Sequence, residues 1–184
     1  MDGTFDGWRD SDAVDAVTAD ALRARRGDAA AATAFVRATQ SDVWRLCAHL
    51  GTHGAADDLT QETYARAFAS LHRFAGRSSA RTWLLSIARR VCADAVRAAV
   101  RARATELEAL EHAPDPAESV ALNAMLAALD PQRREAFVLT QLVGLSYAEA
   151  ADVAGCPVGT IRSRVARARD DLVAAFGDGR RRAV

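Results

Sequence analysis

The stretch "LSYAEAADVAGCPVGTIRSRVARAR", residues 145–169, constrains the fold most, because it has the punctuation of two short helices joined by a tight turn. Ser146 and Glu149 form the S-x-x-E pattern of a capping box, which opens a helix. Gly155 offers the left-handed conformation that ends a helix, and Pro157 suits the first position of the next one. This pattern predicts a helix-turn-helix, whose second helix commonly enters the major groove of DNA.

The second of these helices divides its arginines between two faces. At about 100° per residue, an apolar stripe runs along it, formed by Ile161, Val165, Ala168, Leu172 and Phe176. The side away from this stripe carries Thr160, Ser163, Arg164 and Arg167, whereas Arg162 and Arg169 flank the stripe. We therefore expect Arg164 and Arg167 to meet base edges, and Arg162 and Arg169 to meet phosphates or a protein neighbour. A solvated arginine face is the alternative, since all 24 basic residues of the chain are arginine.

The rest of the chain shows helical periodicity and no strand candidate, so we expect an all-α fold of two small helical domains joined by an extended linker. Alanine is abundant, which favours helix. Pro114 and Pro116 interrupt an acidic stretch without arginine and predict the linker. Helices are expected at 21–50, 56–74, 82–97, 118–129, 131–142, 146–153 and 157–176. The expected organisation is an acidic, disordered extension at 1–20, a first domain at 21–97, a linker at 98–117, a second domain at 118–176 and a basic tail at 177–184.

Composition and cysteine spacing exclude several classes of protein. Cys47, Cys92 and Cys156 are scattered and odd in number, which opposes a disulfide framework and favours a reducing compartment. No apolar run approaches the ~20 residues of a membrane span. The first 20 residues hold six aspartates and one arginine, the opposite of a signal peptide. These features predict a cytoplasmic protein without membrane contact.

The N-terminal half carries two signals for a macromolecular partner. Asp58, Gln61 and Glu62 share one face near the start of a helix, where acidic groups complement the helix dipole and also offer a docking surface for a basic partner. Seven arginines and one aspartate lie between residues 77 and 103, next to a small polar loop flanked by Phe74 and Trp83. Arginines and aromatic rings around such a loop suit single-stranded DNA. Burial in the core is the alternative for both rings.

Together these motifs resemble the extracytoplasmic-function sigma factors of the sigma-70 family, small two-domain initiation subunits of bacterial RNA polymerase. "DDLTQETYARAF" resembles region 2.2 of that family, "RFAGRSSARTWLLSIARR" resembles regions 2.3 and 2.4, and the C-terminal helix-turn-helix resembles region 4. Three such motifs in the correct order, with an acidic linker between the last two, are far more specific than one. Within the family, "RSSARTWLL" and "GCPVGTIRSRVARAR" are most similar to the sigma-C type.

The resemblance implies a role for each matching residue. Core RNA polymerase would be bound at the clamp helices of its largest subunit by Asp58, Gln61 and Glu62, with Tyr64 and Phe68 in support. The −10 promoter element would be bound by Phe74, Arg77, Ser78, Ser79, Arg81, Trp83, Arg89, Arg90 and Arg97. The −35 element would be read by Thr160, Arg162, Ser163, Arg164 and Arg167. The C-terminal domain would also contact the flap of the second-largest subunit, and an anti-sigma factor is a further partner to be considered. The resemblance places the protein at the nucleoid during initiation, with no catalytic group and no cofactor of its own.

Two other functions compete with this interpretation. A stand-alone helix-turn-helix regulator explains residues 130–176 but leaves the N-terminal motifs without a role. An enzyme or redox protein needs a catalytic or metal-ligating set, and Cys47, His49 and His53 are the nearest approach to one, with Cys47 and Cys92 as a redox alternative. Glycines interrupt this segment and no fourth ligand is near, whereas zinc takes four defined ligands. We therefore expect no metal site and no enzymatic activity.

Overall fold

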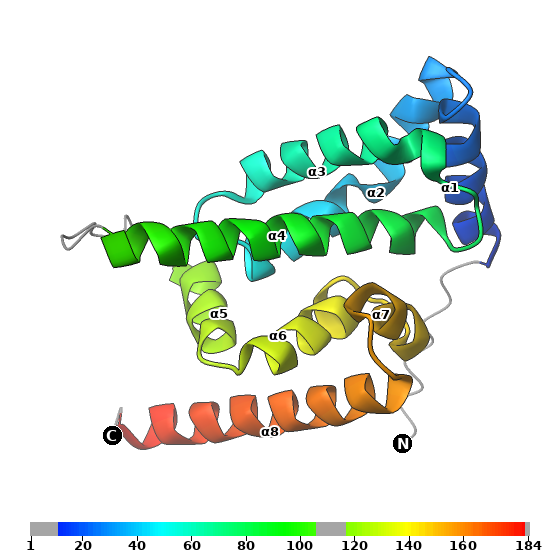
Figure 1. Ribbon diagram of the computed structural model, residues 1–184. Coiled ribbons are helices and arrows are strands. Elements are labelled where there is room, and N and C mark those ends of the chain that lie inside the picture. The colour runs from blue at the N-terminus through cyan, green and yellow to red at the C-terminus, as the bar shows by residue number, and fades with distance from the viewer. Residues whose placement is uncertain (1–10, 106–116, 183–184) are drawn as a thin grey trace.

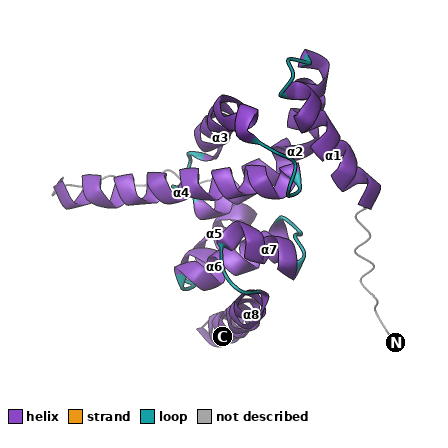
Figure 2. Ribbon diagram, turned by 45° about the vertical axis from the view of Figure 1, so that its right-hand side comes forward, coloured by secondary structure: helices purple, strands orange, loops and turns teal. Residues whose placement is uncertain are grey.

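Helices form every regular element of residues 11–105 and 117–182, the parts of the chain that the computed structural model describes (Figure 1). No strand occurs within these ranges, which confirms the predicted all-α class (Figure 2). None of the helices described is long and apolar enough to cross a membrane. The elements are α1 Ser11–Ala24, α2 Ala29–Leu50, α3 Ala56–Ser70, η1 Leu71–Arg73, α4 Ala80–Thr105, α5 Ala117–Ala127, α6 Pro131–Phe137, η2 Val138–Leu142, α7 Tyr147–Ala154 and α8 Val158–Arg182.

Helices α1–α4 form an N-terminal unit in which the predicted helix over 21–50 is split in two. Gly27 adopts a φ of +95°, and the Asp28 side chain caps α2 by accepting the N–H of Ala31 at 3.0 Å. Ahead of this turn, α1 packs on α2 and α4, and Ala21 is fully buried. The expected disorder is therefore wrong for residues 11–20, because a short apolar stripe lies among the aspartates. Residues 1–10 lie outside the described residues.

Two other predicted boundaries move because helices continue past them. Helix α4 extends to Thr105, so residues 98–105 are helical rather than part of a linker. This segment is rich in alanine and arginine and lacks glycine and proline, so nothing in it ends a helix. The rest of the predicted linker, 106–116, is outside the described residues. Helix α8 likewise runs through most of the predicted basic tail, to Arg182.

Helices α5–α8 form the C-terminal unit, in which α8 lies on the outside (Figure 1). The Asp130 side chain accepts the N–H groups of Gln132 and Arg133 at 3.0 and 3.2 Å, and Pro131 takes the first helical position of α6. Helix α6 then continues into a π-helical turn, η2. The buried stripe of α8 is the predicted one as far as its middle: Ile161, Val165 and Ala168.

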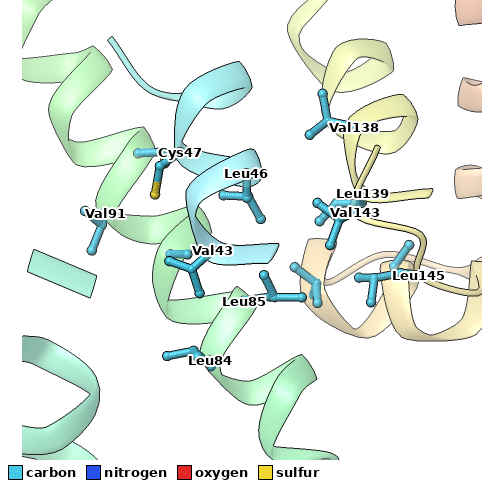
Figure 3. Packing of buried hydrophobic residues seen from close by; sticks show 14 of the residues in the cluster. Val43, Leu46, Cys47, Leu84, Leu85, Val91, Val138, Leu139, Val143 and Leu145 are labelled. Carbon is cyan, nitrogen blue, oxygen red and sulfur yellow. The ribbon is translucent and has the colours of Figure 1, made fainter. Parts of the chain in front are cut away.

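The two units pack against each other and share one hydrophobic core. The contact between them is called the seam. Leu46 of α2 and Leu85 of α4 point toward Leu139, Val143 and Leu145 of the C-terminal unit (Figure 3). Each of these side chains is at most 5% exposed. Burying a side chain of this size contributes about 1.5–3 kcal/mol. Apolar burial therefore holds the units together, and the polar residues of the seam are positioned by it.

Candidate functional site

The helix-turn-helix forms as predicted between α7 and α8. The Ser146 hydroxyl accepts the N–H of Glu149 at 3.2 Å, and the Glu149 carboxylate accepts the N–H of Ser146 at 2.8 Å, which completes the capping box. Gly155 has a φ of +67°, and a Cβ there would meet no atom within 4 Å, so backbone conformation alone requires glycine. Pro157 lies just before α8, where its carbonyl accepts the N–H of Thr160 at 2.9 Å. The turn thus directs α8 across the outer face of the unit.

The exposed face of α8 differs in part from the predicted one. Arg162, Ser163 and Arg167 are exposed and Thr160 is half-buried. Arg164 instead reaches back to α6 and donates its Nη2 to Gln132 Oε1 at 2.6 Å. The expectation that Arg164 projects away from the protein is therefore corrected, because the Gln132 amide lies within its reach.

Arg169, one of the two arginines predicted to flank the apolar stripe of α8, is also held by a neighbouring element. Arg169 is exposed, but it donates its Nη2 to Gln141 Oε1 at 2.8 Å. Among residues 158–175 of α8, Arg162 and Arg167 therefore present their guanidinium groups most openly to solvent, one near the start of the helix and one about a turn and a half later.

The acidic start of α3 lies on the surface of the N-terminal unit. Asp58, Gln61 and Glu62 are all exposed, as their spacing predicts. The Glu62 carboxylate accepts from Arg66 Nε at 2.7 Å, an i, i+4 pair. No side chain caps the start of α3, although Asp57 and Asp58 both suit that role by sequence. Asp58 and Gln61 are consequently the most open groups of this face.

A tryptophan beside this face is not among the residues predicted from the sequence to contact a partner. Trp44 is 46% exposed, and its Nε1 donates to Asp57 Oδ1 at 2.9 Å. It borders an open groove of about 690 Å³ between α2 and α3, to which Gln40 and Gln61 also contribute. The signal was available: the buried residues of α2 recur at Val43, Leu46 and Cys47, and Trp44 is one residue out of that register.

The two aromatic side chains expected to support this face differ in burial. The Tyr64 hydroxyl lies 2.7 Å from Thr39 Oγ1, and burial raises the pKa of Tyr64 to about 12. Its ring centroid is 6.4 Å from that of Phe68, which is 40% exposed. Tyr64 therefore fixes α3 on α2, while Phe68 extends the exposed apolar surface along α3.

The loop between η1 and α4 holds its aromatic residues inward. Phe74 is 4% exposed, and its ring packs on the half-buried Trp83 at a centroid distance of 4.8 Å. Core burial, the alternative weighed for Phe74, is the correct one. Arg77 and Ser78 project into solvent, and Ser79 is half-buried, its Oγ accepting the N–H of Thr82 at 3.4 Å. The exposed part of the loop is thus small, polar and basic.

Two of the four arginines predicted on α4 are engaged in the seam. Arg81 is 8% exposed, pairs with Asp42 at 2.6 Å and donates to the Val143 carbonyl at 2.9 Å. Arg89 is part-buried and forms an ion pair with Glu135 of α6, which raises the pKa of its guanidinium. These contacts join the two units through charge-assisted hydrogen bonds.

The other two arginines of α4 lie on the open part of the helix. Arg90 is exposed, and Arg97 is exposed but pairs with Asp94 at 2.5 Å. Asp94 also accepts from Arg66 of α3 at 2.9 Å, so its pKa is lowered by the two guanidinium groups. The residues predicted to line one DNA path are therefore divided between the seam and the surface.

The cysteines and histidines weighed as metal or redox groups do not assemble into one site. Cys47 and Cys92 are buried thiols in contact, and the hydrogen bond from Cys92 lowers the pKa of Cys47. His49 Nδ1 hydrogen-bonds Asn123 Oδ1 across the seam at 2.9 Å, while His53 is exposed. Over the described residues, no three His, Cys, Asp or Glu side chains are grouped as a metal would require.

Comparison with known proteins covers both units. Residues 35–102 match the family model for Sigma-70 region 2, and residues 119–172 match that for Sigma-70, region 4. The probable RNA polymerase sigma-C factor of Mycobacterium bovis is 54% identical over 168 residues, covering 87% of this chain and 91% of that protein. The ECF RNA polymerase sigma factor SigC of Mycobacterium tuberculosis matches to the same extent.

Solved structures share the arrangement of helices. CnrH, in complex with the cytosolic domain of CnrY, superposes with a TM-score of 0.74 at 28% identity, covering 89% of this chain and 98% of that one. The sigma factor RpoE of Bartonella quintana, in complex with the anti-sigma factor NepR, gives a TM-score of 0.65 at 29% identity, covering 77% and 94%. Sequence and structure therefore identify the same group of relatives.

Proposed function

The chain belongs to the extracytoplasmic-function sigma factors of the sigma-70 family, and from this premise we propose how its two units divide the work of promoter recognition. The function of such a protein is to direct RNA polymerase to promoters as an alternative sigma factor. The N-terminal unit binds core polymerase and the −10 element, and the C-terminal unit reads the −35 element. The observation that carries this assignment is the pair of exposed faces on different units: the acidic start of α3 and the basic face of α8.

The polymerase-binding face consists of Asp58, Gln61 and Glu62, extended by Phe68 and by Trp44 at the edge of the groove. Its expected partner is the clamp-helix coiled coil of the largest polymerase subunit. Carboxylates at the rim favour a basic partner, and an exposed tryptophan beside a groove has the character of a binding hot spot. The C-terminal unit contacts the flap of the second-largest subunit in the same assembly.

The −10 element is bound by the loop before α4 and by the open part of that helix. Arg77, Ser78 and Ser79 receive a base flipped from the non-template strand, and Arg90 and Arg97 meet the backbone. Phe74 supports Trp83 from behind instead of stacking on a base. Flipping costs a few kcal/mol, which contacts from the basic and polar groups of this loop and helix offset.

Arg81 and Arg89 have a different place in this scheme, because they hold the seam. Arg81 is buried, donates to Asp42 and to the Val143 carbonyl, and acts in packing. Arg89 reaches DNA once it exchanges Glu135 for a phosphate, so promoter binding at α4 competes with this ion pair.

The −35 element is read by the N-terminal half of α8 in the major groove. Arg167 and Ser163 contact base edges and Arg162 contacts phosphate, with Thr160 at the start of the helix. Arg164 joins them by releasing Gln132. Holding both units on one polymerase raises their effective concentration at correctly spaced elements, so neither needs high affinity alone.

Run-off transcription with purified core polymerase on a promoter library tests the assignment. We expect promoter-specific transcripts that depend on the chain, and weaker core binding for Trp44→Ala, by about tenfold or more. Val100→Ala, which shortens another exposed apolar side chain of the N-terminal unit, is the matched control. Operator binding without any affinity for core polymerase would instead identify a stand-alone helix-turn-helix regulator.

One further partner follows from the relatives. The sigma factor RpoE of Bartonella quintana was solved bound to an anti-sigma factor, and we propose a regulatory protein of that class for this chain. Co-purification of the tagged chain from its own cells, followed by a transcription assay of the captured protein, tests this. A captured protein that leaves run-off transcription unchanged would exclude it as an anti-sigma factor.

A further inference from the structure

A recess of about 300 Å³ opens at the seam. Its residue Arg134 also borders a second hollow beside Arg89 and Arg97. One wall is the C-terminal end of α2 and the loop after it, and the opposite wall is formed by α5 and α6. Its polar groups are His49 and His53 from the N-terminal unit and Asn123 and Arg134 from the C-terminal unit. Because both units contribute, whatever occupies the recess contacts both.

Arg134 is the unusual member of this set. Its Nε is buried and has no hydrogen-bond partner in the described part of the structure. The seam arginines on α4 are satisfied: Arg81 by Asp42, and Arg89 by Glu135, the residue next to Arg134. A buried donor without an acceptor is destabilising, and more so when it is charged. Such a group in a folded protein indicates an acceptor, a bound ion or a water, that completes it.

The neighbouring groups favour an anion in that position. Asn123 Oδ1 accepts from His49 Nδ1 at 2.9 Å, so the Asn123 amide keeps its two N–H donors. His53 also borders the recess. A guanidinium in the same recess opposes a metal cation. The set therefore suits an oxyanion, and arginine recognises phosphate through a planar fork of donors.

The size and walls of the recess indicate more than a bare ion. A volume of about 300 Å³ lies at the lower end of the range for small-molecule sites, about 300–1,000 Å³. Ala124 and Ala127 line the side formed by α5 and offer an apolar surface to the rest of a ligand.

We propose that the recess binds a small phosphomonoester, with its phosphate against Arg134 and its body against α5. The ligand bridges the two units and stabilises their packed arrangement. By linkage, a ligand that binds only the packed arrangement shifts the chain toward it in proportion to its occupancy. This inference does not depend on the promoter contacts proposed above.

Binding is measured on the full chain by isothermal titration calorimetry with inorganic phosphate and with phenyl phosphate, against sodium chloride at matched ionic strength. We expect saturable binding of both, tighter for phenyl phosphate. Arg134→Gln should weaken it by about tenfold or more, because a charge-assisted contact is lost. Arg133→Gln is the matched control: it removes the adjacent guanidinium, which pairs with Asp171 at 2.7 Å outside the recess.

A second variant keeps the charge and fills the space. Ala127→Leu, at an exposed position, should exclude phenyl phosphate while the circular dichroism spectrum stays that of the parent. Equal losses in the Arg133 and Arg134 variants, or the same heat from chloride, would reduce the effect to general charge screening. No binding by the parent chain would mean that water satisfies Arg134, and the proposal would be wrong.

Two further arms test the source of the phosphate and the bridging. A short non-promoter duplex at the same phosphate concentration should not compete with phenyl phosphate, and competition would reassign Arg134 to the DNA backbone. Hydrogen exchange should slow at the end of α2 and in α5 together when phenyl phosphate binds. Protection of one unit alone would overturn the bridging.

Discussion

The two units present their candidate DNA-binding residues in opposite ways. On α8, Arg162 and Arg167 face solvent, because the C-terminal unit uses α6, η2 and α7 to pack and leaves α8 outside (Figure 1). On α4, Arg81 is buried and Arg89 is paired with Glu135, because the same helix forms the seam. Because α4 both packs against the C-terminal unit and carries candidate DNA-binding residues, two of its arginines are already paired within the protein. We therefore propose that the −35 face meets DNA as it stands, whereas the −10 face gains Arg89 only when its ion pair with Glu135 opens.

The variant with the largest expected effect on this contrast weakens the seam and leaves the core of each unit intact. Leu85→Ala removes a side chain that points from α4 toward the C-terminal unit (Figure 3). We expect a loss of about 2–5 kcal/mol from the free energy of unfolding. Because this loss falls on the contact between units, small-angle scattering should show a larger radius of gyration at urea concentrations where both units are still helical.

Leu84→Ala is the matched control for that experiment. Leu84 is equally buried but points into the N-terminal unit. It should lower stability by a similar amount without separating the units. If both variants expand the chain alike, the seam is not an independent contact and the contrast between the two faces loses its basis.

The role of the open face of α8 can be tested with two arginines, one open to solvent and one held by a neighbouring side chain. Arg167→Ala should reduce discrimination among −35 sequences by about 1–3 kcal/mol, because a base contact is lost. Arg169→Ala, whose guanidinium is held by Gln141, should weaken binding evenly and lower its salt dependence. Competition binding of labelled duplexes at several salt concentrations separates the two effects. Equal losses of affinity in both variants, independent of the −35 sequence, would contradict the assignment of Arg167 to bases and Arg169 to phosphates.

What could be predicted from the sequence was chemistry between near neighbours. The capping box of Ser146 and Glu149 and the left-handed Gly155 involve residues three apart or one backbone conformation, so their residue types specify them. The exposed start of α3 follows from a single helical period. Both candidate faces were therefore found, with Asp58, Gln61 and Arg167 on the surface as expected.

What could not be predicted depends on contacts between distant residues. Arg89 and Glu135 are 46 positions apart, and neither shows in its local pattern that the other will cover it. Arg164 was assigned by helix angle alone, but its long side chain reaches Gln132, 32 positions away. Trp44 was not predicted for a different reason: it lies directly beside the buried stripe of α2, where an apolar side chain has the character of a core residue.

The free energy of unfolding at alkaline pH depends on a buried tyrosine of the N-terminal unit, Tyr64. Burial raises the pKa of Tyr64 to about 12, so the folded state keeps its phenol proton longer than the unfolded chain does. Its contribution is fully present below about pH 10 and is lost as pH rises toward 12, by up to about 1.4 kcal/mol per pH unit. Urea unfolding at pH 9, 10 and 11 should show a shallower slope in Tyr64→Phe than in the parent. The buried Cys92 thiol, whose pKa is raised by its hydrogen bond with Cys47 and by burial, accounts for the slope that remains. Tyr147→Phe, in the C-terminal unit, should keep the parent slope, and a shallower slope there would misplace the effect.

The smallest expected effect concerns the starts of two helices: α3, which carries the acidic face, and α7, which precedes the turn into α8. Helix α7 starts with a complete capping box, whereas α3 has Ala55 at its N-cap position and no side-chain cap. Ser146→Ala should therefore lower the free energy of unfolding by about 1 kcal/mol, read from urea midpoints, because the N–H of Glu149 loses its acceptor. Ser163→Ala is the control, since its hydroxyl donates to the Thr160 carbonyl on an exposed turn and caps nothing. Ala55→Ser should gain less than Ser146→Ala loses, because Ala55 has a ψ of 12° instead of the extended value that a capping side chain needs. A gain as large as that loss would mean that the start of α3 adjusts to accept a cap, and the acidic face would then be less firmly fixed than the turn before α8.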